Sequence, residues 1–439
     1  MTRRTIGRLA LSLIVFVLCA ELLALLWYGA RTGSLFYVRP DVEQETVVAP
    51  QDQLATEIAV HPYFGFAHIP NAGFHDERTE RLKRQGWPAE EAAKSRTNNF
   101  GFISPLAYPV EKTRDNQFFV GIFGGSVGMW FCQVGVPHLI SELREQPFFQ
   151  DKEIVPLCFS FSGYKQPQLA LVLGYFLAIG QRFDLVVNID GFNDVALGAL
   201  NDARGADVSM PSIQHLGGLV NVVNHSTMTP DKLEALTGIV RDRARLVNLS
   251  HTIRTNRSAA IDFVLNAYYS RAQMRYAADL ARYDALPSNP VQNSLIQVTP
   301  PTAARDRTRM FADIAALWTR SSLQMRDLLA THGSAYVHVL QPNQYFTTRR
   351  FSEAEAATAL SDASPYKRSV EEGYPVLQAE ARSTLVGNKV SFFDATAILD
   401  REAEQVYVDD CCHYTLTGNR LLAEFIVTAI RSTPGPWNP

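Results

Sequence analysis

The sequence lacks the features that mark several large functional classes. It carries no excess of positive charge, because 41 Lys and Arg are set against 44 Asp and Glu, for a formal net charge of -3. It has no basic stripe with interleaved aromatic residues, so we expect no nucleic-acid partner. The Gly-rich spacings of P-loop and dinucleotide-binding proteins are missing as well. No internal repeat or low-complexity tract occurs, and 46% hydrophobic residues are enough to fill a core, so the chain is expected to be globular.

Cysteine is scarce, with five residues in a chain of 439. Cys411 and Cys412 are adjacent, but no second Cys or His pair follows at the spacing of zinc fingers. No two cysteines have the two-residue gap that is common in thiolate sites. We therefore expect no metal ion and no cofactor.

One long hydrophobic run stands out near the N-terminus. Residues 9–30 are apolar for long enough to cross a bilayer as a helix, with Trp27 and Tyr28 suited to the far interface. The positive charges that precede the run are Arg3, Arg4 and Arg8. The pattern predicts an uncleaved membrane anchor (1–30) with a cytoplasmic N-terminus and the rest of the chain outside the cytoplasm. A cleaved signal peptide is the alternative, although no clear A-x-A site follows the run.

Glu21 interrupts this run. A carboxylate near the middle of a bilayer is energetically costly. The sequence leaves two explanations open: Glu21 faces another membrane helix, which would imply a membrane-protein partner, or it is protonated.

The rest of the chain changes character along its length. Residues 31–60 are polar and aperiodic, as expected of a linker, and residues 61–117 contain Gly-, Pro- and aromatic-rich stretches typical of short strands and turns. A main domain is expected at 118–432, where short apolar runs alternate with helical sequence, and this pattern predicts an α/β fold with buried parallel strands. The runs are residues 118–125, 153–160, 184–191, 335–342 and 390–396.

Two stretches of the main domain are too long to be loops. Residues 197–330 have helical spacing at 259–284 and 304–329, so we expect a mostly helical insertion that covers a cleft. A second insertion, residues 343–389, is placed to do the same. Residues 166–180 are too short and broken for a membrane span and are expected to form a buried crossover helix.

Ser126 is a candidate nucleophile. It lies in the sequence GGSVG (124–128), directly after a predicted strand and before helical sequence. A serine at such a turn exposes its hydroxyl at the carboxyl edge of the sheet, beside the N–H groups that begin a helix. The simpler interpretation is that the glycines only permit a tight turn.

Five further candidate residues follow predicted strands or lie near the C-terminus. The Gly163 backbone N–H and the Asn193 amide could donate to a developing oxyanion, although Gly and Asn are also common at ordinary strand ends. Asp410 and His413 are three residues apart, so the carboxylate could orient the imidazole as a general base. Asp409, four residues from His413, is a second candidate for the acid.

Taken together, these residues resemble the four sequence blocks of the SGNH, or GDSL-like, hydrolase superfamily. The blocks are GGSV around Ser126, FSGY around Gly163, GFND around Asn193, and DCCH from Asp410 to His413. The stretch NNFGF (98–102) also looks like the N-x-x-G-F segment of membrane-anchored bacterial members. The first block departs from the family pattern, with G-G-S in place of G-D-S. The G-x-S-x-G elbow of α/β-hydrolases is a competing match, but that fold takes its acid and histidine from separate loops.

The resemblance implies a flavodoxin-like three-layer fold with a five-stranded parallel sheet. It implies a Ser126, His413 and Asp410 triad, with an oxyanion hole made by Ser126, Gly163 and Asn193. The expected activity is that of an esterase or O-acyltransferase on an acylated glycan, cell-wall polymer or lipid, in the periplasm at the bacterial inner membrane. The alternative is a non-catalytic glycan-binding or assembly subunit of a polysaccharide export system that keeps the fold.

In an oxidising compartment, the cysteines outside residues 9–30 are candidates for a disulfide. Cys132 lies on the predicted helix that starts near Ser126, and Cys411 and Cys412 immediately precede His413. We therefore expect a bridge from Cys132 to Cys411 or Cys412.

Overall fold

The computed structural model describes residues 3–33, 35–38, 58–73, 96–216, 228–287 and 298–438. The chain folds into two compact units. The helical unit is made of Met1–Gln53 and Asn221–Ile296, and the sheet unit of Leu54–Val220 and Gln297–Pro439. The N-terminal residues thus fold together with residues from the middle of the chain.

The sheet unit is built on five parallel strands, as the sequence predicts. Their order across the sheet is β4-β3-β5-β6-β7. After β3 the chain adds β4 on one side of it, and then adds β5, β6 and β7 on the other side. The carboxyl ends of β3 and β5 therefore meet at the point where the direction of winding reverses, which is where open α/β sheets bind ligands. The strands are β3 (Gln117–Gly124), β4 (Glu153–Ser160), β5 (Leu185–Asp190), β6 (Ala335–Leu340) and β7 (Phe392–Asp394).

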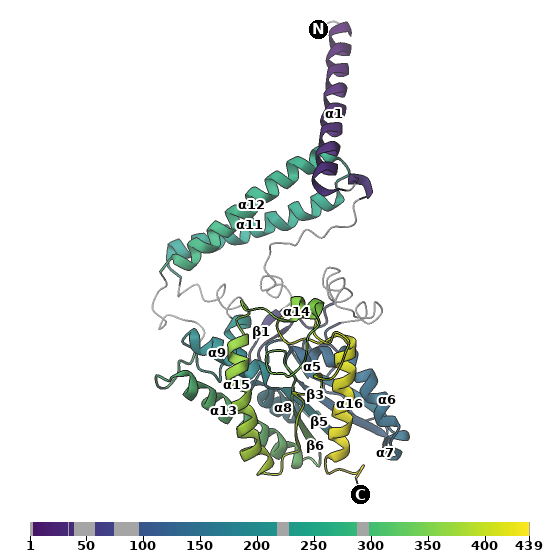
Figure 1. Ribbon diagram of the computed structural model, residues 1–439, viewed down its shortest axis with the longest axis vertical. Coiled ribbons are helices and arrows are strands. Elements are labelled where there is room, and N and C mark those ends of the chain that lie inside the picture. The colour runs from purple at the N-terminus through teal and green to yellow at the C-terminus, as the bar shows by residue number, and fades with distance from the viewer. Residues whose placement is uncertain are drawn as a thin grey trace. The chain divides into compact units, whose positions relative to one another are not determined.

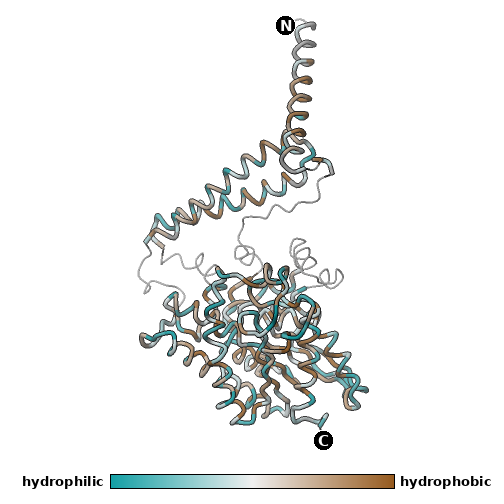
Figure 2. The backbone as a smooth tube through the Cα atoms, viewed as in Figure 1, coloured by the Kyte–Doolittle hydropathy of each residue, from teal (hydrophilic) through white to brown (hydrophobic). Residues whose placement is uncertain are grey.

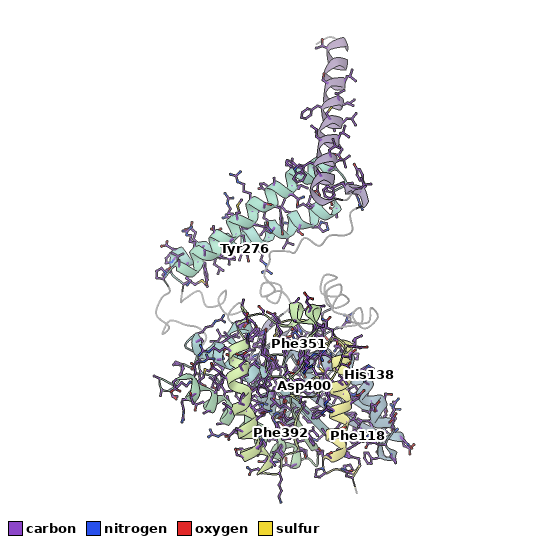
Figure 3. The ribbon with its side chains drawn as sticks, in the orientation of Figure 1. Phe118, His138, Tyr276, Phe351, Phe392 and Asp400 are labelled. Atoms are coloured by element: carbon purple, nitrogen blue, oxygen red, sulfur yellow. A yellow bond between two sulfur atoms is a disulfide. The ribbon has the colours of Figure 1, made fainter. Side chains whose placement is uncertain are left out.

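Helices cover both faces of this sheet, so the three-layer α/β expectation is confirmed (Figure 1). One layer contains α5 (Ser126–Trp130), η2 (Phe131–Gly135), α6 (Val136–Arg144), α7 (Pro147–Gln150) and α16 (Leu416–Ser432). The other contains α8 (Gln168–Ala178), α9 (Phe192–Ala203), α13 (Arg307–Ala330), α15 (Lys367–Glu380) and η5 (Ala381–Val386). The core is rich in aromatic rings, and Figure 3 labels two of its contributors, Phe118 on β3 and Phe392 on β7. The expected crossover helix at 166–180 is α8.

The lead-in segment forms short strands, as expected from its composition. A hairpin of β1 (Ile58–His61) and β2 (Gly65–His68) packs on α8 through the ring of Phe64 and its aromatic neighbours. The described part of 61–117 continues with the antiparallel bridge of Thr97 to Ile103. Most of the predicted linker, 31–60, lies outside the described residues.

The structure divides the predicted helical insertion between the two units. The amphipathic helix α13 packs on β6 and α9 in the sheet unit, with Trp318 fully buried, and so completes a layer of the fold. In contrast, α11 (Pro230–Thr255) and α12 (Ala259–Ala285) belong to the helical unit. The second insertion adds α14 (Glu353–Ala359) and α15 to the sheet unit.

The helical unit consists of α1 (Arg3–Thr32), the short turn η1 (Phe36–Val38) and the hairpin of α11 and α12. The hairpin has its own apolar core, to which Leu246 contributes from α11 and Tyr276, labelled in Figure 3, contributes from α12. Along α1, large apolar side chains such as Leu11 and Phe16 are exposed, and the helix is brown over much of its length in Figure 2. Among the residues that the structure describes, no helix reaches the length and apolarity needed to span a membrane.

The structure gives Glu21 a partner within the chain. Its carboxylate accepts hydrogen bonds from the Ser258 hydroxyl at 2.6 Å and from the backbone N–H groups of Ala259 and Ala260 at 2.6 and 3.1 Å. The Tyr37 hydroxyl donates to the same carboxylate. Glu21 therefore satisfies N–H groups at the start of α12 that a helix leaves unpaired, and its negative charge lies at the positive end of the helix dipole.

Replacing Glu21 with Gln is expected to loosen the first turn of α12. The amide keeps one acceptor oxygen and loses the charge that strengthens these bonds, so amide exchange at 259–262 should become roughly 10-fold faster or more. Hydrogen–deuterium exchange of the full chain measures this effect. Glu234→Gln, at an exposed position on α11, is the matched control, and equal exchange in both variants would contradict the capping role.

Candidate active site

Ser126 and His413 are 287 positions apart in the sequence and lie next to each other in the sheet unit. Ser126 is the first residue of α5, directly after β3, and its Oγ lies 2.7 Å from His413 Nε2. The other imidazole nitrogen, Nδ1, lies 2.5 Å from Asp409 Oδ2. The three side chains form a continuous hydrogen-bonded line from hydroxyl to carboxylate.

The carboxylate in this line belongs to Asp409 and not to Asp410, the residue that the D-x-x-H spacing predicts for this position. The reason is the shape of the loop 408–413, which is closed by an antiparallel bridge between Tyr407 and Tyr414. In this tight loop the fourth residue after Asp409 comes back over its carboxylate, whereas the Asp410 backbone carbonyl is held by the Tyr345 hydroxyl at 2.9 Å. Asp409, the second candidate in the sequence, has the geometry that Asp410 was expected to have.

Asp409 also shapes the loop through its second oxygen. Oδ1 accepts from the backbone N–H groups of Cys411, Cys412 and His413 at 3.0, 3.1 and 3.2 Å. Burial raises the pKa of this carboxyl, but the neighbouring His413 and the N–H donors outweigh burial and lower the pKa to about 2. Asp409 is therefore ionised across the pH range of ordinary assays. The stability that comes from its lowered pKa is present above the ordinary value and is lost only as the pH falls toward 2.

Helix α5 contributes a second residue to the site. Trp130 is one helical turn after Ser126, and its ring stacks on His413 with centroids 5.1 Å apart and planes 17° from parallel. Residues four apart lie on the same helix face, so α5 presents the hydroxyl and the indole together. The spacing S-x-x-x-W on a helix could have indicated this residue from the sequence.

Asn193 lies beside the turn that carries Ser126. It is the second residue of α9, directly after β5, and its Nδ2 donates to the Tyr164 carbonyl at 2.8 Å. A Cβ on Gly125 would come within 2.2 Å of the same Nδ2, so only glycine lets the amide approach this closely. An amide nitrogen has two hydrogens, so Nδ2 keeps one donor in addition to its bond to Tyr164.

Gly163 lies in the turn after β4, next to Tyr164. Its φ of +82° favours glycine, and a Cβ there would meet the ring of His215 at 2.4 Å. Burial lowers the pKa of His215 to about 4, so the imidazole beside the turn is neutral at neutral pH. His215 stacks on Phe66 and bonds to Ser212. His215 could not be predicted from the sequence, because it comes from the insertion and not from a strand end.

If Asn193 has the oxyanion role that the SGNH resemblance implies, Asn193→Ala is expected to lower kcat by roughly 10²- to 10³-fold with little change in KM, because such a donor acts mainly on the transition state. Steady-state kinetics on an aryl acetate, with thermal unfolding to confirm folding, measure this effect. A rise in KM at unchanged kcat would instead assign Asn193 to substrate binding.

Three consecutive residues after β6 hold the histidine loop in place. Asn343 and Gln344 donate to the carbonyls of Cys411 and Asp409, each at 3.1 Å, and the Tyr345 hydroxyl donates to Asp410. Each of these side chains thus bonds to a backbone carbonyl of the loop. These three residues could not be predicted from the sequence, because nothing local in it pairs residues about 65 positions apart.

A buried ion pair supports the same loop from below. The side chains of Arg349 and Glu355 are each 1% exposed and 2.7 Å apart, and Glu355 accepts from the backbone N–H groups of Val406 and Tyr407. Arg349 donates to three further carbonyls, those of Leu399, Glu402 and Glu404. Phe351 and Asp400, labelled in Figure 3, belong to the same region: the Phe351 ring neighbours Tyr407, and Asp400 binds the Thr347 hydroxyl. Residues of the second insertion therefore hold the histidine loop in position.

The disulfide differs from the expected one. Cys132 bonds to Cys158, on β4, while Cys411 and Cys412 are not in a disulfide. Since β4 is the neighbour of β3 in the sheet, the helical turn that follows β3 passes close to the end of β4. The bridge thus links η2 to the sheet and leaves the histidine loop unbridged.

No protein-family model matches this chain, and no curated protein matches its sequence.

Proposed function

We propose that this protein is a serine esterase or O-acyltransferase that acts on an acylated glycan or other cell-envelope substrate outside the cytoplasm. The observation that carries the proposal is the position of His413, which links Ser126 Oγ at 2.7 Å to the ionised Asp409 at 2.5 Å. A hydroxyl, an imidazole and a carboxylate in this order are the arrangement that activates serine in acyl transfer.

The fold supports the same proposal. The strand order β4-β3-β5-β6-β7 corresponds to the flavodoxin-like order 2-1-3-4-5. Ser126 and Asn193 follow β3 and β5, the two strands at the reversal of winding. With Gly163 after β4 and His413 near the C-terminus, this is the arrangement that the SGNH resemblance implies, with Asp409 in place of Asp410.

In the proposed reaction, Ser126 Oγ attacks the carbonyl carbon of an ester while its proton passes to His413 Nε2. Asp409 keeps the proton on Nδ1 and stabilises the imidazolium that forms. The oxyanion is bound by the backbone N–H groups of Ser126 and Gly163 and by Asn193 Nδ2. Collapse of the intermediate breaks the ester C–O bond, and His413 returns the proton to the leaving alcohol. Water or a sugar hydroxyl then attacks the acyl-enzyme, giving hydrolysis or transfer.

Two observations support a location outside the cytoplasm. The Cys132–Cys158 disulfide suits an oxidising compartment. The exposed apolar side chains of α1 suit attachment to the inner membrane of a bacterium. Acylated polysaccharides are the ester substrates that such a location offers.

A pocket beside the histidine loop supports a glycan as substrate. It shares Gln344 and Tyr345 with the contacts that hold the loop. Its lining combines the aromatic rings of Tyr345 and Phe351 with polar and charged side chains, and such a surface can pack on a sugar ring and form hydrogen bonds to its hydroxyls. Its lining is Gln344, Tyr345, Thr347, Phe351, Leu360, Ser361, Asp362, Lys367 and Glu371.

The alternative role, a non-catalytic assembly subunit, drew support from Glu21 as a contact for a membrane partner. That support is weakened, because the carboxylate is already bonded to Ser258, Ala259 and Ala260 of the same chain.

Covalent capture tests the proposal. The full chain treated with a fluorophosphonate probe is expected to gain one probe mass, and peptide mapping should locate the probe on Ser126. His413→Ala should label much more slowly, because the base that activates the hydroxyl is missing. An unlabelled, folded wild-type chain would overturn the enzyme proposal in favour of the binding role.

A further inference from the structure

Two thiols lie beside the line of Ser126, His413 and Asp409 and have no part in the proposed reaction. Cys411 Sγ and Cys412 Sγ are 3.5 Å apart, and Cys412 Sγ is 3.9 Å from Ser126 Oγ. The two sulfur atoms and a ring nitrogen of His413 all lie within 4.8 Å of one another. We propose that Cys411, Cys412 and His413 form a binding site for a single thiophilic divalent cation such as Zn²⁺ or Cd²⁺, next to Ser126.

The loop conformation explains why adjacent cysteines can act together. In an extended strand, neighbouring side chains point to opposite faces, so a Cys-Cys pair cannot converge on one ion. Here the backbone of Cys411, Cys412 and His413 wraps around Asp409 Oδ1, which accepts from all three N–H groups. The wrap turns the three consecutive side chains toward a common point.

The distances suit a tetrahedral ion. Two thiolates bound at about 2.3 Å lie roughly 3.8 Å apart, close to the 3.5 Å between the two sulfur atoms. The widest separation, 4.8 Å, has to shrink by roughly 1 Å to bring all three atoms within bonding range. Two cysteines and one histidine are a ligand set that zinc uses with its fourth position open. Thiolate ligands also favour soft metals over Mg²⁺ and Ca²⁺.

The surroundings of His413 match those of a metal ligand. A ligating histidine usually donates its other ring nitrogen to a carboxylate, which fixes the ring. Asp409 does this at Nδ1, so Nε2, which lies 2.7 Å from Ser126 Oγ, is the nitrogen left to bind an ion. The same Nε2 is the atom that accepts the serine proton in the proposed reaction. A bound ion and an active serine are therefore mutually exclusive, and the cation is expected to inhibit.

The inhibitory consequence rests on the proposed function, whereas the binding site itself does not. The test uses the full chain, purified without oxygen and titrated with Cd²⁺. Cadmium–thiolate charge-transfer absorption reports ligation by sulfur, and equilibrium dialysis reports stoichiometry. We expect one ion per chain. Cys411→Ser and Cys412→Ser should each weaken binding by more than the roughly 10- to 100-fold that loss of an outer partner costs.

Two further variants serve as controls. Cys19→Ser changes a cysteine outside the cluster and should leave the titration unchanged. Ser126→Ala should still bind Cd²⁺, so binding is measured separately from catalysis. In the wild type, Zn²⁺ should stop ester hydrolysis and a chelator should restore it.

Three results would overturn the metal site. The first is no charge-transfer absorption in folded, reduced protein, and the second is a titration of both cysteine variants that equals that of the wild type. The third is a disulfide between Cys411 and Cys412, found by mass spectrometry in freshly isolated chain. If Cd²⁺ binds with the expected cysteine dependence but no ester is hydrolysed, the proposed function fails and the metal site stands.

Discussion

Ser126→Ala is expected to reduce ester hydrolysis by roughly 10⁴- to 10⁶-fold, to the level that binding and oxyanion contacts alone support. The substitution removes the Oγ that lies 2.7 Å from His413 Nε2 and leaves the base with nothing to activate. The loss should be in kcat, because the serine acts in the chemical step. Steady-state kinetics on short aryl esters measure the loss, with fluorophosphonate labelling as a second readout.

Ser334→Ala is the matched control. Ser334 is as buried as Ser126, at 9% exposure, but its hydroxyl donates to the Phe183 carbonyl at the opposite edge of the sheet, before β6. We expect this variant to be somewhat less stable and to keep its activity. If both variants keep their activity, Ser126 is not the nucleophile.

The second large effect separates two neighbouring aspartates. Asp409→Asn is expected to lower kcat by roughly 10⁴-fold, as for the triad acid of other serine enzymes. The new amide can still accept the backbone N–H groups of the loop, but its NH₂ donates toward His413 Nδ1, so Nε2 can no longer act as the base. Asp410→Asn should change kcat by no more than a few-fold, because the structure ties this residue to Tyr345 through its backbone carbonyl.

The pair is informative because the two substitutions are chemically identical and one residue apart. Parallel kinetics on both variants, with thermal unfolding to compare stability, measure the contrast. A larger loss in Asp410→Asn than in Asp409→Asn would restore the assignment made from the D-x-x-H spacing and reject the loop geometry.

The sequence predicted the sheet well, because its signals are local. Runs such as 118–125 and 153–160 are apolar, of strand length and followed by helical sequence, and they became β3 and β4. The structure also places Ser126 and Asn193 after strands that prove to be neighbours. In a parallel sheet every carboxyl end lies on one edge, so strand ends alone give an approximate site.

The choice between Asp409 and Asp410 depends on loop shape, which the sequence does not encode locally. Both residues fit a turn that carries His413, and only the bridge of Tyr407 to Tyr414 decides which carboxylate lies under the ring. The Cys132–Cys158 bridge follows from the order of strands in the sheet, which apolar runs do not reveal.

The bonds of Glu21 have a practical consequence for truncation. A common way to express a protein with an apolar N-terminal helix is to delete that segment and produce the rest. Here that deletion would remove α1. Ser258, Ala259 and Ala260 at the start of α12 would then lose the Glu21 carboxylate that accepts their hydrogen bonds. Phe263 would lose its ring contact with Trp27. During synthesis, α1 emerges from the ribosome more than two hundred residues before Ser258, so the bonds of Glu21 can form only late. A fragment intended to fold alone should therefore omit both residues 1–53 and residues 221–296. A short flexible linker would join residue 220 to residue 297.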